Sequence, residues 1–393
     1  MSPDQTAVAV PAMLPVMRPW LGDAEAAAAA AAVASGWVAQ GPRVAEFELA
    51  LAARLGAPHA VVVSSCTAAL HLALVLAEVG PGDEVVVPSL SFIATANAAR
   101  YVGARPVFAD VDPVTQNVTV ETVQAAITPA TRAVIAVDQG GMPADIEPLR
   151  VLCHDRGLVL VQDSACAIGS TYRGRPVGGD AELSAYSFHP RKLLTTGEGG
   201  ALAISDPDQA ARARRLREHG MSVSAADRHS SGRTVIEDYA ETGFNYRMTD
   251  VQAAIGLVQL GRLDEMIGRR RFLAARYQAA LAGVPGLRVC ADPPYGTTNY
   301  QSFWVELADE FPLTRNELLE WLLRDGISAR RGIMAAHREP AYAAGGPFDL
   351  PVTDRLTTRT VILPLFHQMT EDDVDRVVSS VRSAAAVPGR GAA

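Results

Sequence analysis

Cysteine is scarce in this sequence, and no hydrophobic run is long enough to cross a membrane. The four cysteines among 393 residues show no C-x-x-C spacing, and they are too few for a disulfide framework in a chain of this length. No apolar stretch reaches the roughly 20 residues that span a bilayer, and the start of the sequence lacks the pattern of a secretory signal. We therefore expect a cytoplasmic protein rather than a secreted or membrane-inserted one.

Two common nucleotide-binding motifs are also missing. The chain has neither G-x-x-x-x-G-K-[ST] nor G-x-G-x-x-G after a strand, so its glycines mark neither a P-loop nor a dinucleotide site. A net charge of −8 argues against a broad nucleic-acid surface. Short basic clusters at residues 212–215 and 269–271 fall in helix-like segments, where we expect solvated helix faces. We predict no metal site.

Hydrophobic residues, by contrast, make up 49% of the chain, enough for the cores of two domains. Between residues 42 and 204, apolar β-rich runs alternate with helical patterns. Strands are predicted at residues 60–63, 84–87, 106–108, 133–137 and 158–161, and helices at residues 67–76, 93–101, 120–127 and 146–156. This alternation is typical of an α/β fold whose mostly parallel sheet is covered by helices and binds ligands at the carboxyl ends of its strands.

The pattern changes after residue 204. Predicted helices at 209–219, 249–260 and 264–281 flank a polar segment, 221–243, which we interpret as an ordered functional loop or an arm that contacts a partner. Two more strands (301–305 and 360–364) and two more helices (314–324 and 371–382) indicate a smaller α+β domain. We predict a large ligand-binding domain over residues 25–260, and a small domain formed by residues 1–24 and 261–393.

Lys192 is the strongest candidate in the sequence for a residue that binds a cofactor covalently. Lys192 lies in the segment SFHPRKLLTTGEGG, residues 187–200, which follows the apolar strand that ends at Asp163. Enzymes that use pyridoxal phosphate (PLP) place their Schiff-base lysine at a similar distance after the aspartate that faces the pyridine nitrogen. Most lysines lie on solvated faces, however, and a run such as residues 197–200 is more often only a turn. The interpretation therefore depends on the residues around Lys192.

A phosphate site is predicted where the strand at residues 61–63 leads into a helix. The amides of Thr67 and Ala68 would lie at the helix N-terminus, which binds anions through free N–H groups and the helix dipole. Ser187 would add a hydroxyl from the other side. The alternative for Thr67 is a plain helix cap.

The cofactor ring would need a partner for its nitrogen and a surface to stack on. Asp163, at the end of a buried strand, can keep a pyridine nitrogen protonated through a charge-assisted hydrogen bond, so that the ring accepts electrons. Phe92 follows another strand and can stack on the opposite ring face, although core packing is an equally good explanation from local sequence. Lys192 would hold the cofactor as an imine and then carry a proton, which requires a neutral amine favoured by burial and nearby positive charge.

These motifs resemble the DegT/DnrJ/EryC1/StrS family, the sugar aminotransferases of PLP fold type I, over nearly the whole chain. The matching segments are residues 35–42, 66–74, 82–85, 91–97, 108–113, 143–145, 187–200, 244–254 and 363–365. The resemblance implies a Schiff base at Lys192, a pyridine-nitrogen partner at Asp163 and a stacking aromatic at Phe92.

The same resemblance implies how the phosphate is held and how the chains assemble. Phosphate contacts would come from Thr67, Ala68 and Ser187, and from Asn245 of a second subunit, so that the site forms at a homodimer interface. His189 lies in the motif, and we interpret it as a positioning or packing residue.

Two positions depart from the family pattern. Cys166 stands where the family usually has Gln or His in contact with the ring hydroxyl, and a thiol is a much weaker hydrogen-bonding group. Asp138 stands at a strand end that often holds His. Gln139 or a water molecule is the expected substitute on the oxygen side of the cofactor.

The resemblance implies an aminotransferase that loads PLP with an amino group from glutamate or glutamine and aminates a keto group of a nucleotide-linked deoxysugar, as in antibiotic or polysaccharide biosynthesis. A keto-cyclitol is the alternative acceptor. The sugar dehydratases of the family carry His in place of the lysine, so Lys192 argues against them, and the acidic charge without a DNA-binding segment argues against a PLP-binding regulator.

Candidate substrate-side groups are Trp37, Gln40, residues 221–243, Arg330 to Met334, His337 and Arg338, although ion pairing is an equally good explanation for the arginines.

Overall fold

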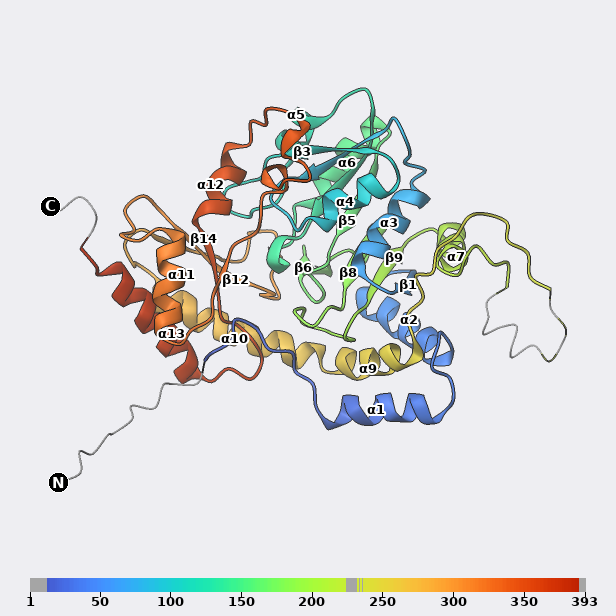
Figure 1. Cartoon of the computed structure of the whole chain (residues 1–393), viewed down its shortest axis with the longest axis horizontal. Helices are drawn as coiled ribbons and strands as arrows, with labels where there is room; N and C mark the ends of the chain where they lie inside the picture. Colours follow the sequence, from blue (N-terminus) through green and yellow to red (C-terminus); the bar gives the residue numbers. More distant parts are fainter. Residues whose placement is uncertain (1–12, 224–231, 233, 235, 389–393) are drawn as a thin grey trace.

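The computed structural model describes residues 13–223, 232, 234 and 236–388. A seven-stranded sheet with the order β1-β9-β8-β5-β4-β2-β3 forms its centre (Figure 1). The strands are β1 (His59–Val63), β2 (Glu84–Pro88), β3 (Arg105–Ala109), β4 (Thr131–Val137), β5 (Val159–Asp163), β8 (Leu183–Ser187) and β9 (Gly200–Ile204). All neighbours from β8 to β3 pair in parallel, whereas β9 is antiparallel to both β8 and β1. The predicted α/β class is confirmed.

Helices cover both faces of this sheet because its strands are hydrophobic on both sides. On one face, α3 (Cys66–Leu76), α4 (Ala94–Tyr101) and α7 (Pro207–Leu216) share one hydrophobic cluster with residues such as Val61 and Val85. On the other face, Val62 and Val86 belong to two clusters that include residues of α2 (Pro42–Leu55), α5 (Val120–Ala126), α6 (Ile146–Arg156) and α9 (Asp250–Gly261). Helix α1 (Asp23–Ala34) packs alongside α9 (Figure 1).

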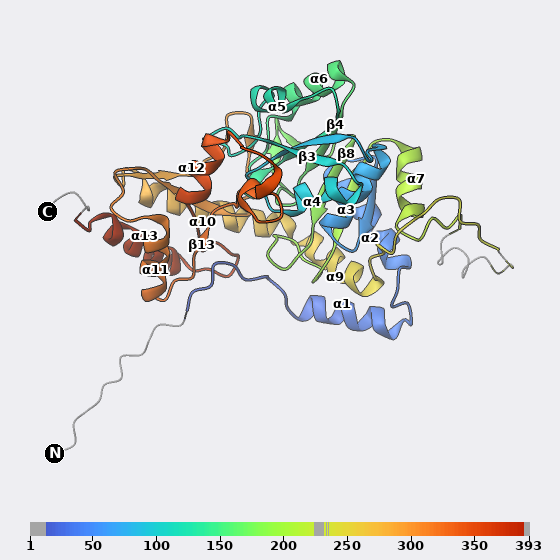
Figure 2. The ribbon, with the colours of Figure 1, turned by 45° about the horizontal axis from the view of Figure 1, so that its top comes forward.

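A second, antiparallel sheet with the order β10-β12-β14-β13 lies beside the first. It consists of β10 (Leu287–Val289), β12 (Phe303–Leu307), β13 (Arg330–Arg331) and β14 (Thr360–Leu363), and it is accompanied by α11 (Arg315–Arg324), α12 (Pro351–Arg359) and α13 (Glu371–Ala385). Figure 2 shows α11 and α13 together, away from α5 and α6 of the large sheet. A small three-stranded sheet is formed by β6 (Thr171–Tyr172), β7 (Arg175–Pro176) and β11 (Gly296–Thr297).

Helix α10 (Leu263–Leu281) connects the two cores. Leu263 and Met266 belong to a cluster under the large sheet, whereas Leu273 and Leu281 belong to the cluster of the antiparallel sheet. The beginning of the described chain joins this second region, because Leu14 forms a parallel bridge with Ile327. The domain boundary at residue 260 stays a prediction. Within the described part of the chain, no helix has the length and apolar character needed to span a membrane.

Candidate active site

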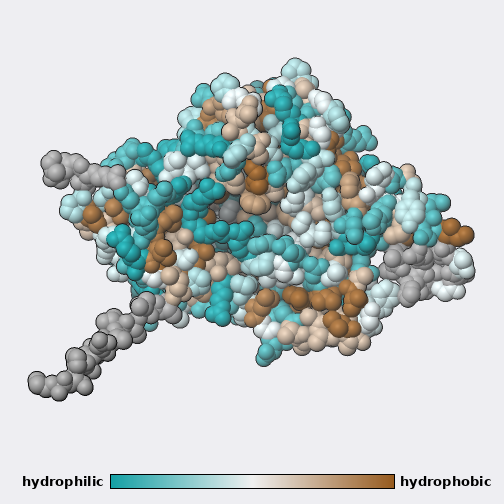
Figure 3. Space-filling view, in the orientation of Figure 1, coloured by the Kyte–Doolittle hydropathy of each residue, from teal (hydrophilic) through white to brown (hydrophobic). Residues whose placement is uncertain are grey.

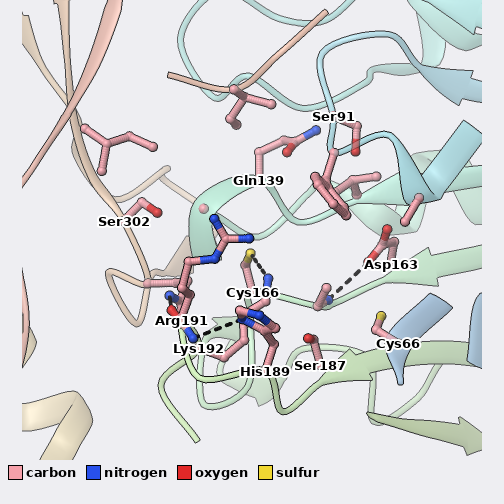
Figure 4. Close-up of a pocket in the computed structure, with 18 of the residues that line it drawn as sticks. Cys66, Ser91, Gln139, Asp163, Cys166, Ser187, His189, Arg191, Lys192 and Ser302 are labelled. Carbon is pink, nitrogen blue, oxygen red and sulfur yellow. Dashed lines mark hydrogen bonds between the residues drawn. The ribbon is translucent and has the colours of Figure 1, made fainter. Parts of the chain in front are cut away.

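A cavity of about 530 Å³ opens between the carboxyl ends of the parallel strands and the antiparallel sheet. Six of the predicted site residues line it together: Thr67, Phe92, Asp163, Cys166, Ser187 and Lys192. They come from the start of α3, from the segments that follow β2, β5 and β8, and from the ends of β5 and β8 themselves. Figure 4 shows four of them, Asp163, Cys166, Ser187 and Lys192, around the cavity. The topology of the parallel sheet brings them together, because strand ends distant in sequence meet at one edge.

Two predicted residues lie outside this cavity lining. Ala68 is buried, and its N–H donates to Ser65 Oγ at 3.1 Å. Asn245 forms an antiparallel bridge with Glu218 beyond the end of α7. Their contacts with a phosphate stay predictions, that of Asn245 with a second subunit.

The loop that carries Lys192 is held by hydrogen bonds from distant segments. Gln301 Oε1 accepts from the N–H of Leu193 at 2.8 Å, and Gln301 Nε2 donates to the Arg191 carbonyl at 2.6 Å. Arg270 in turn donates to the carbonyls of Tyr300 and Gln301, each at 2.8 Å. These bonds fix the backbone on both sides of Lys192.

The expectation of a solvated helix face is wrong for Arg270. Its side chain is buried, with 3% of the residue exposed, because it satisfies the two loop carbonyls. Its neighbours are also engaged: Arg271 pairs with Asp292 at 2.8 Å, and Arg214 of the other basic cluster pairs with Glu48 at 3.2 Å. The basic clusters connect elements of the fold.

Lys192 donates a hydrogen bond from Nζ to Cys166 Sγ at 2.9 Å (Figure 4). Burial lowers the pKa of this amine, but Cys166, Cys66 and Asp163 around it raise the pKa by more, so that it lies above the ordinary value. Burial alone therefore does not produce the neutral amine expected from the sequence. His189 accepts from the N–H of Arg191 through Nδ1 at 3.1 Å, so it shapes the turn that precedes Lys192.

Asp163 ends β5 as a buried carboxylate that faces the cavity. Thr95 Oγ1 donates to Oδ2 at 3.0 Å and the N–H of Ala165 donates to Oδ1 at 3.2 Å. Burial raises the pKa of Asp163, while these hydrogen bonds and Lys192 oppose that rise. A cationic ring nitrogen in the cavity would stabilise the ionised carboxylate further.

Asp138 lies behind the cavity and does not contact it. Its buried carboxylate accepts from Ala144 N at 2.8 Å, Ser164 Oγ at 2.7 Å and Gln162 Nε2 at 3.1 Å. Burial raises the pKa of Asp138 to about 7 against the effect of these donors. Gln139, the next residue, does line the cavity, and its amide donates to the Leu90 carbonyl. Of the two, only Gln139 is placed to meet a ligand.

The start of α3 is capped by Ser65, so Thr67 is not the helix cap. Thr67 lies in the first turn, where backbone N–H groups have no partner within the helix. Gly200 packs directly against this turn, and a Cβ at that position would collide with the backbone of Ser65 and Cys66. The glycine run at residues 197–200 is therefore more than a turn, because its last member lets β9 approach the helix N-terminus.

Phe92 is 62% exposed and lines the cavity, which excludes core packing as the reason for its position. An exposed aromatic face at a cavity is a surface on which a planar ligand ring can stack.

The candidate substrate-side residues divide into two groups. Arg330 to Met334 line the cavity, whereas Arg338 pairs with Asp354 at 2.5 Å and His337 Nδ1 lies 2.7 Å from Ser89 Oγ. Trp37 and Gln40 do not line it, and part of the segment 221–243 lies outside the described residues. Ion pairing thus explains the position of Arg338, whereas Arg330 has no ion-pair partner in the described part of the chain.

Sequence reasoning missed Gln301, Arg191 and Thr95 as parts of this site. No local motif marks Gln301, and Thr95 lies within the family-like segment 91–97, but each acts through a partner distant in sequence. One simple signal for Lys192 was also available: it is the only lysine in the chain, and the other 34 of the 35 basic residues are arginines.

Comparison with known proteins places this geometry in a family. The model of the DegT/DnrJ/EryC1/StrS aminotransferase family matches residues 19–382. The aminotransferase TlmJ from Streptoalloteichus hindustanus is similar at 39% identity and a TM-score of 0.88, over 95% of this chain and 99% of TlmJ. DesI, solved in the presence of its TDP-sugar product, is similar at 34% identity and a TM-score of 0.85, over 95% of this chain and 93% of DesI. Spr1654 from Streptococcus pneumoniae, in its PLP form, is similar at 28% identity and a TM-score of 0.88, over 95% of this chain and 98% of Spr1654. The chain therefore belongs to the DegT/DnrJ/EryC1/StrS family of PLP-dependent aminotransferases.

Proposed function

We propose that this enzyme transfers an amino group from glutamate or glutamine to a keto group of a nucleotide-linked deoxysugar. The observation that carries the proposal is the convergence of Lys192, Asp163 and the start of α3 on one cavity. An amine, a buried carboxylate and a helix N-terminus are the three groups that the aldehyde, ring nitrogen and phosphate of PLP require.

The residues that line the cavity fit this cofactor. Asp163 would pair with the ring nitrogen, and Phe92 would stack on the ring. Thr67 would donate its N–H to the phosphate, and Ser187 would add its hydroxyl. When bound, PLP supplies a carbonyl carbon that condenses with amines and a protonated ring that takes up electrons from a broken C–H bond.

Lys192 would hold the cofactor and then act as the proton carrier of the reaction. Its Nζ is positioned by the backbone clamp at Leu193 and Arg191 and by the hydrogen bond to Cys166. As a free amine, Lys192 would accept a proton from the substrate carbon and return it during the reaction. Cys166, Cys66 and Asp163 raise the pKa of Lys192, and pairing of Asp163 with a ring cation would remove part of that rise.

The similarity to DesI supports a nucleotide-linked acceptor, because that protein was solved with a TDP-sugar product. We therefore prefer the nucleotide sugar to a keto-cyclitol.

We further propose that the active enzyme is a homodimer in which Asn245 contacts the phosphate of the partner subunit's cofactor. Asn245 does not line the cavity of its own chain. Hydrophobic residues gather over α9 on one face of the molecule (Figure 3), and Val33 of the adjoining α1 is 57% exposed. The apolar surface over α9 and the exposed Val33 support association of two chains, since exposed apolar surface favours binding of a partner.

The decisive experiment gives purified enzyme, PLP and glutamate a panel of keto-sugar nucleotides and keto-cyclitols, and identifies aminated products by mass spectrometry. We expect amination of one or more keto-sugar nucleotides, with 2-oxoglutarate formed in equal amount. Amination of cyclitols alone would contradict the proposed acceptor. Failure of glutamate and of glutamine to convert the bound cofactor would contradict the proposed donor.

A further inference from the structure

Two arginines from distant parts of the chain line the cavity of Lys192. Arg191 belongs to the Lys192 loop and Arg330 to β13, and both are exposed side chains of the cavity lining. Among the residues that the structure describes, no carboxylate lies within 4.0 Å of either guanidinium. Figure 4 shows Arg191 next to Lys192 in the cavity.

The cavity carries an excess of positive charge in an acidic protein. Its lining holds the cations Arg191, Lys192, Arg330 and Arg331, and the carboxylates Asp163 and Glu198. The whole chain, in contrast, has a net charge of −8. The charge of the cavity lining is therefore opposite in sign to the net charge of the chain, and the cavity attracts anions.

The few nearby acidic groups leave this excess largely in place. Arg331 has Glu339 at 3.8 Å, and Glu198 lies 3.8 Å from His189. Burial lowers the pKa of Arg330, and the positive charges of Arg191 and Arg331 lower it further, which indicates that these cations repel one another. Arg338, only a few residues away, instead has Asp354 at 2.5 Å. An anionic ligand would remove the repulsion among the cavity arginines.

We propose that Arg191 and Arg330 bind the diphosphate of a nucleotide-linked acceptor, an inference that rests on the proposed function. Guanidinium groups donate paired hydrogen bonds to phosphate oxygens, and two of them match the two negative charges of a sugar nucleotide diphosphate. The buried Asp163 marks the floor of the cavity, and the exposed arginines mark its rim. The keto carbon thus reaches Lys192 while the diphosphate stays at the rim. A neutral keto-cyclitol has no phosphate for Arg191 and Arg330 to bind, so these arginines would not increase its affinity.

Calorimetric titration of the PLP-loaded enzyme with inorganic pyrophosphate and with thymidine diphosphate tests the proposal independently of turnover. We expect both to bind the wild type, and thymidine, which lacks the diphosphate, to bind at least about 10-fold more weakly. Arg191→Met and Arg330→Met should each weaken pyrophosphate binding about 10-fold, since each removes a charge-assisted contact. The double variant should lose about 100-fold, and Arg330→Lys should recover part of the affinity because it keeps the charge but not the fork.

Arg132→Met is the matched control, because Arg132 is an exposed arginine of β4 outside the cavity lining. It should bind pyrophosphate like the wild type. Absence of measurable pyrophosphate binding to the wild type, or equal binding by the double variant, would overturn the proposal, whatever acceptor the enzyme uses.

Measuring the half-reaction with the amino donor on its own shows whether the two arginines bind the diphosphate of the acceptor or the carboxylate of the donor. The donor half-reaction is followed by the visible absorbance of the bound cofactor as glutamate is added. We expect the glutamate concentration at half-maximal rate to rise much less in Arg330→Met than its pyrophosphate dissociation constant does. A rise in the glutamate requirement that equals or exceeds the change in pyrophosphate affinity would assign the pair to the donor carboxylate and refute the diphosphate site.

Discussion

The side-chain amine of Lys192 donates to the thiol of Cys166, with Nζ 2.9 Å from Sγ. This contact joins the loop between β8 and β9 to the segment that follows β5. Asp163, at the end of β5, also contributes to the high pKa of the amine. The arrangement places the amine, the thiol and the carboxylate at one end of the cavity.

Lys192→Ala should remove the visible absorbance of the bound cofactor and lower kcat by about 10³-fold or more, because the amine both holds the cofactor and carries the proton. Borohydride reduction followed by mass spectrometry provides a second measurement. Since the chain has only one lysine, one cofactor adduct per wild-type chain on the peptide of residues 187–200 assigns the site.

A suitable control restores a lysine elsewhere. The double variant Lys192→Ala/Arg132→Lys carries one lysine outside the cavity lining and should show neither the absorbance nor the adduct. A persistent band in either variant would refute the assignment of Lys192.

Cys166→Ala should have a small effect on the same reaction. The thiol is a weak hydrogen-bond acceptor, so its loss should change kcat/KM by about 5-fold or less, which corresponds to about 1 kcal/mol. Steady-state kinetics measures this change, and the visible absorbance should remain. A loss of more than about 100-fold with an intact absorbance band would mean that the thiol takes part in the chemistry.

Gly200→Ala should weaken cofactor binding by about 10-fold or more. The new methyl group would collide with the backbone of Ser65 and Cys66, and it would displace the N–H groups expected to hold the phosphate. The PLP dissociation constant, measured by titration of the apoenzyme, checks this.

Gly268→Ala is the matched substitution in α10, where a Cβ meets no atom within 4 Å. It should leave PLP affinity unchanged and stabilise the fold by about 1 kcal/mol, because alanine favours the helix. Equal PLP affinity in both variants would show that the close approach at Gly200 does not matter for the cofactor.

His71 should make stability fall as the pH falls. Burial lowers its pKa below the ordinary value of 6.5, and its Nδ1 lies 2.9 Å from the hydroxyl of Tyr246. Below about pH 6.5, the unfolded chain therefore binds a proton at this site more readily than the folded protein does, so acid shifts the equilibrium toward unfolding.

His71→Gln should consequently lose less stability between pH 8 and pH 5 than the wild type does, as measured by urea unfolding at both values. The difference between the free energies of unfolding of the wild type and the variant at pH 8 reports the packing cost of the substitution alone. An unchanged pH dependence in the variant would mean that His71 is not the source.

Much of the fold follows from local signals. Continuous Val and Ile runs such as residues 60–63 predicted buried strands, and α6 (Ile146–Arg156) begins and ends as expected, since Gly157 terminates it in the left-handed conformation with φ of 63°. The edges of the small domain were less accurate: the strand predicted at 301–305 is β12 (Phe303–Leu307). Gln301, just before β12, instead forms hydrogen bonds with the loop that carries Lys192.

The sequence by itself determined the alternation of strands and helices and the order of Asp163 and Lys192 along the chain. These depend on neighbouring residues, whose hydrophobicity and hydrogen bonding act over one or two turns of backbone. Only the tertiary structure decided that Gln301 clamps the Lys192 loop, that Cys166 receives the lysine hydrogen bond, and that Arg191 and Arg330 share one cavity. Those contacts join segments far apart in sequence, and they exist because packing of the two sheets brings their edges together.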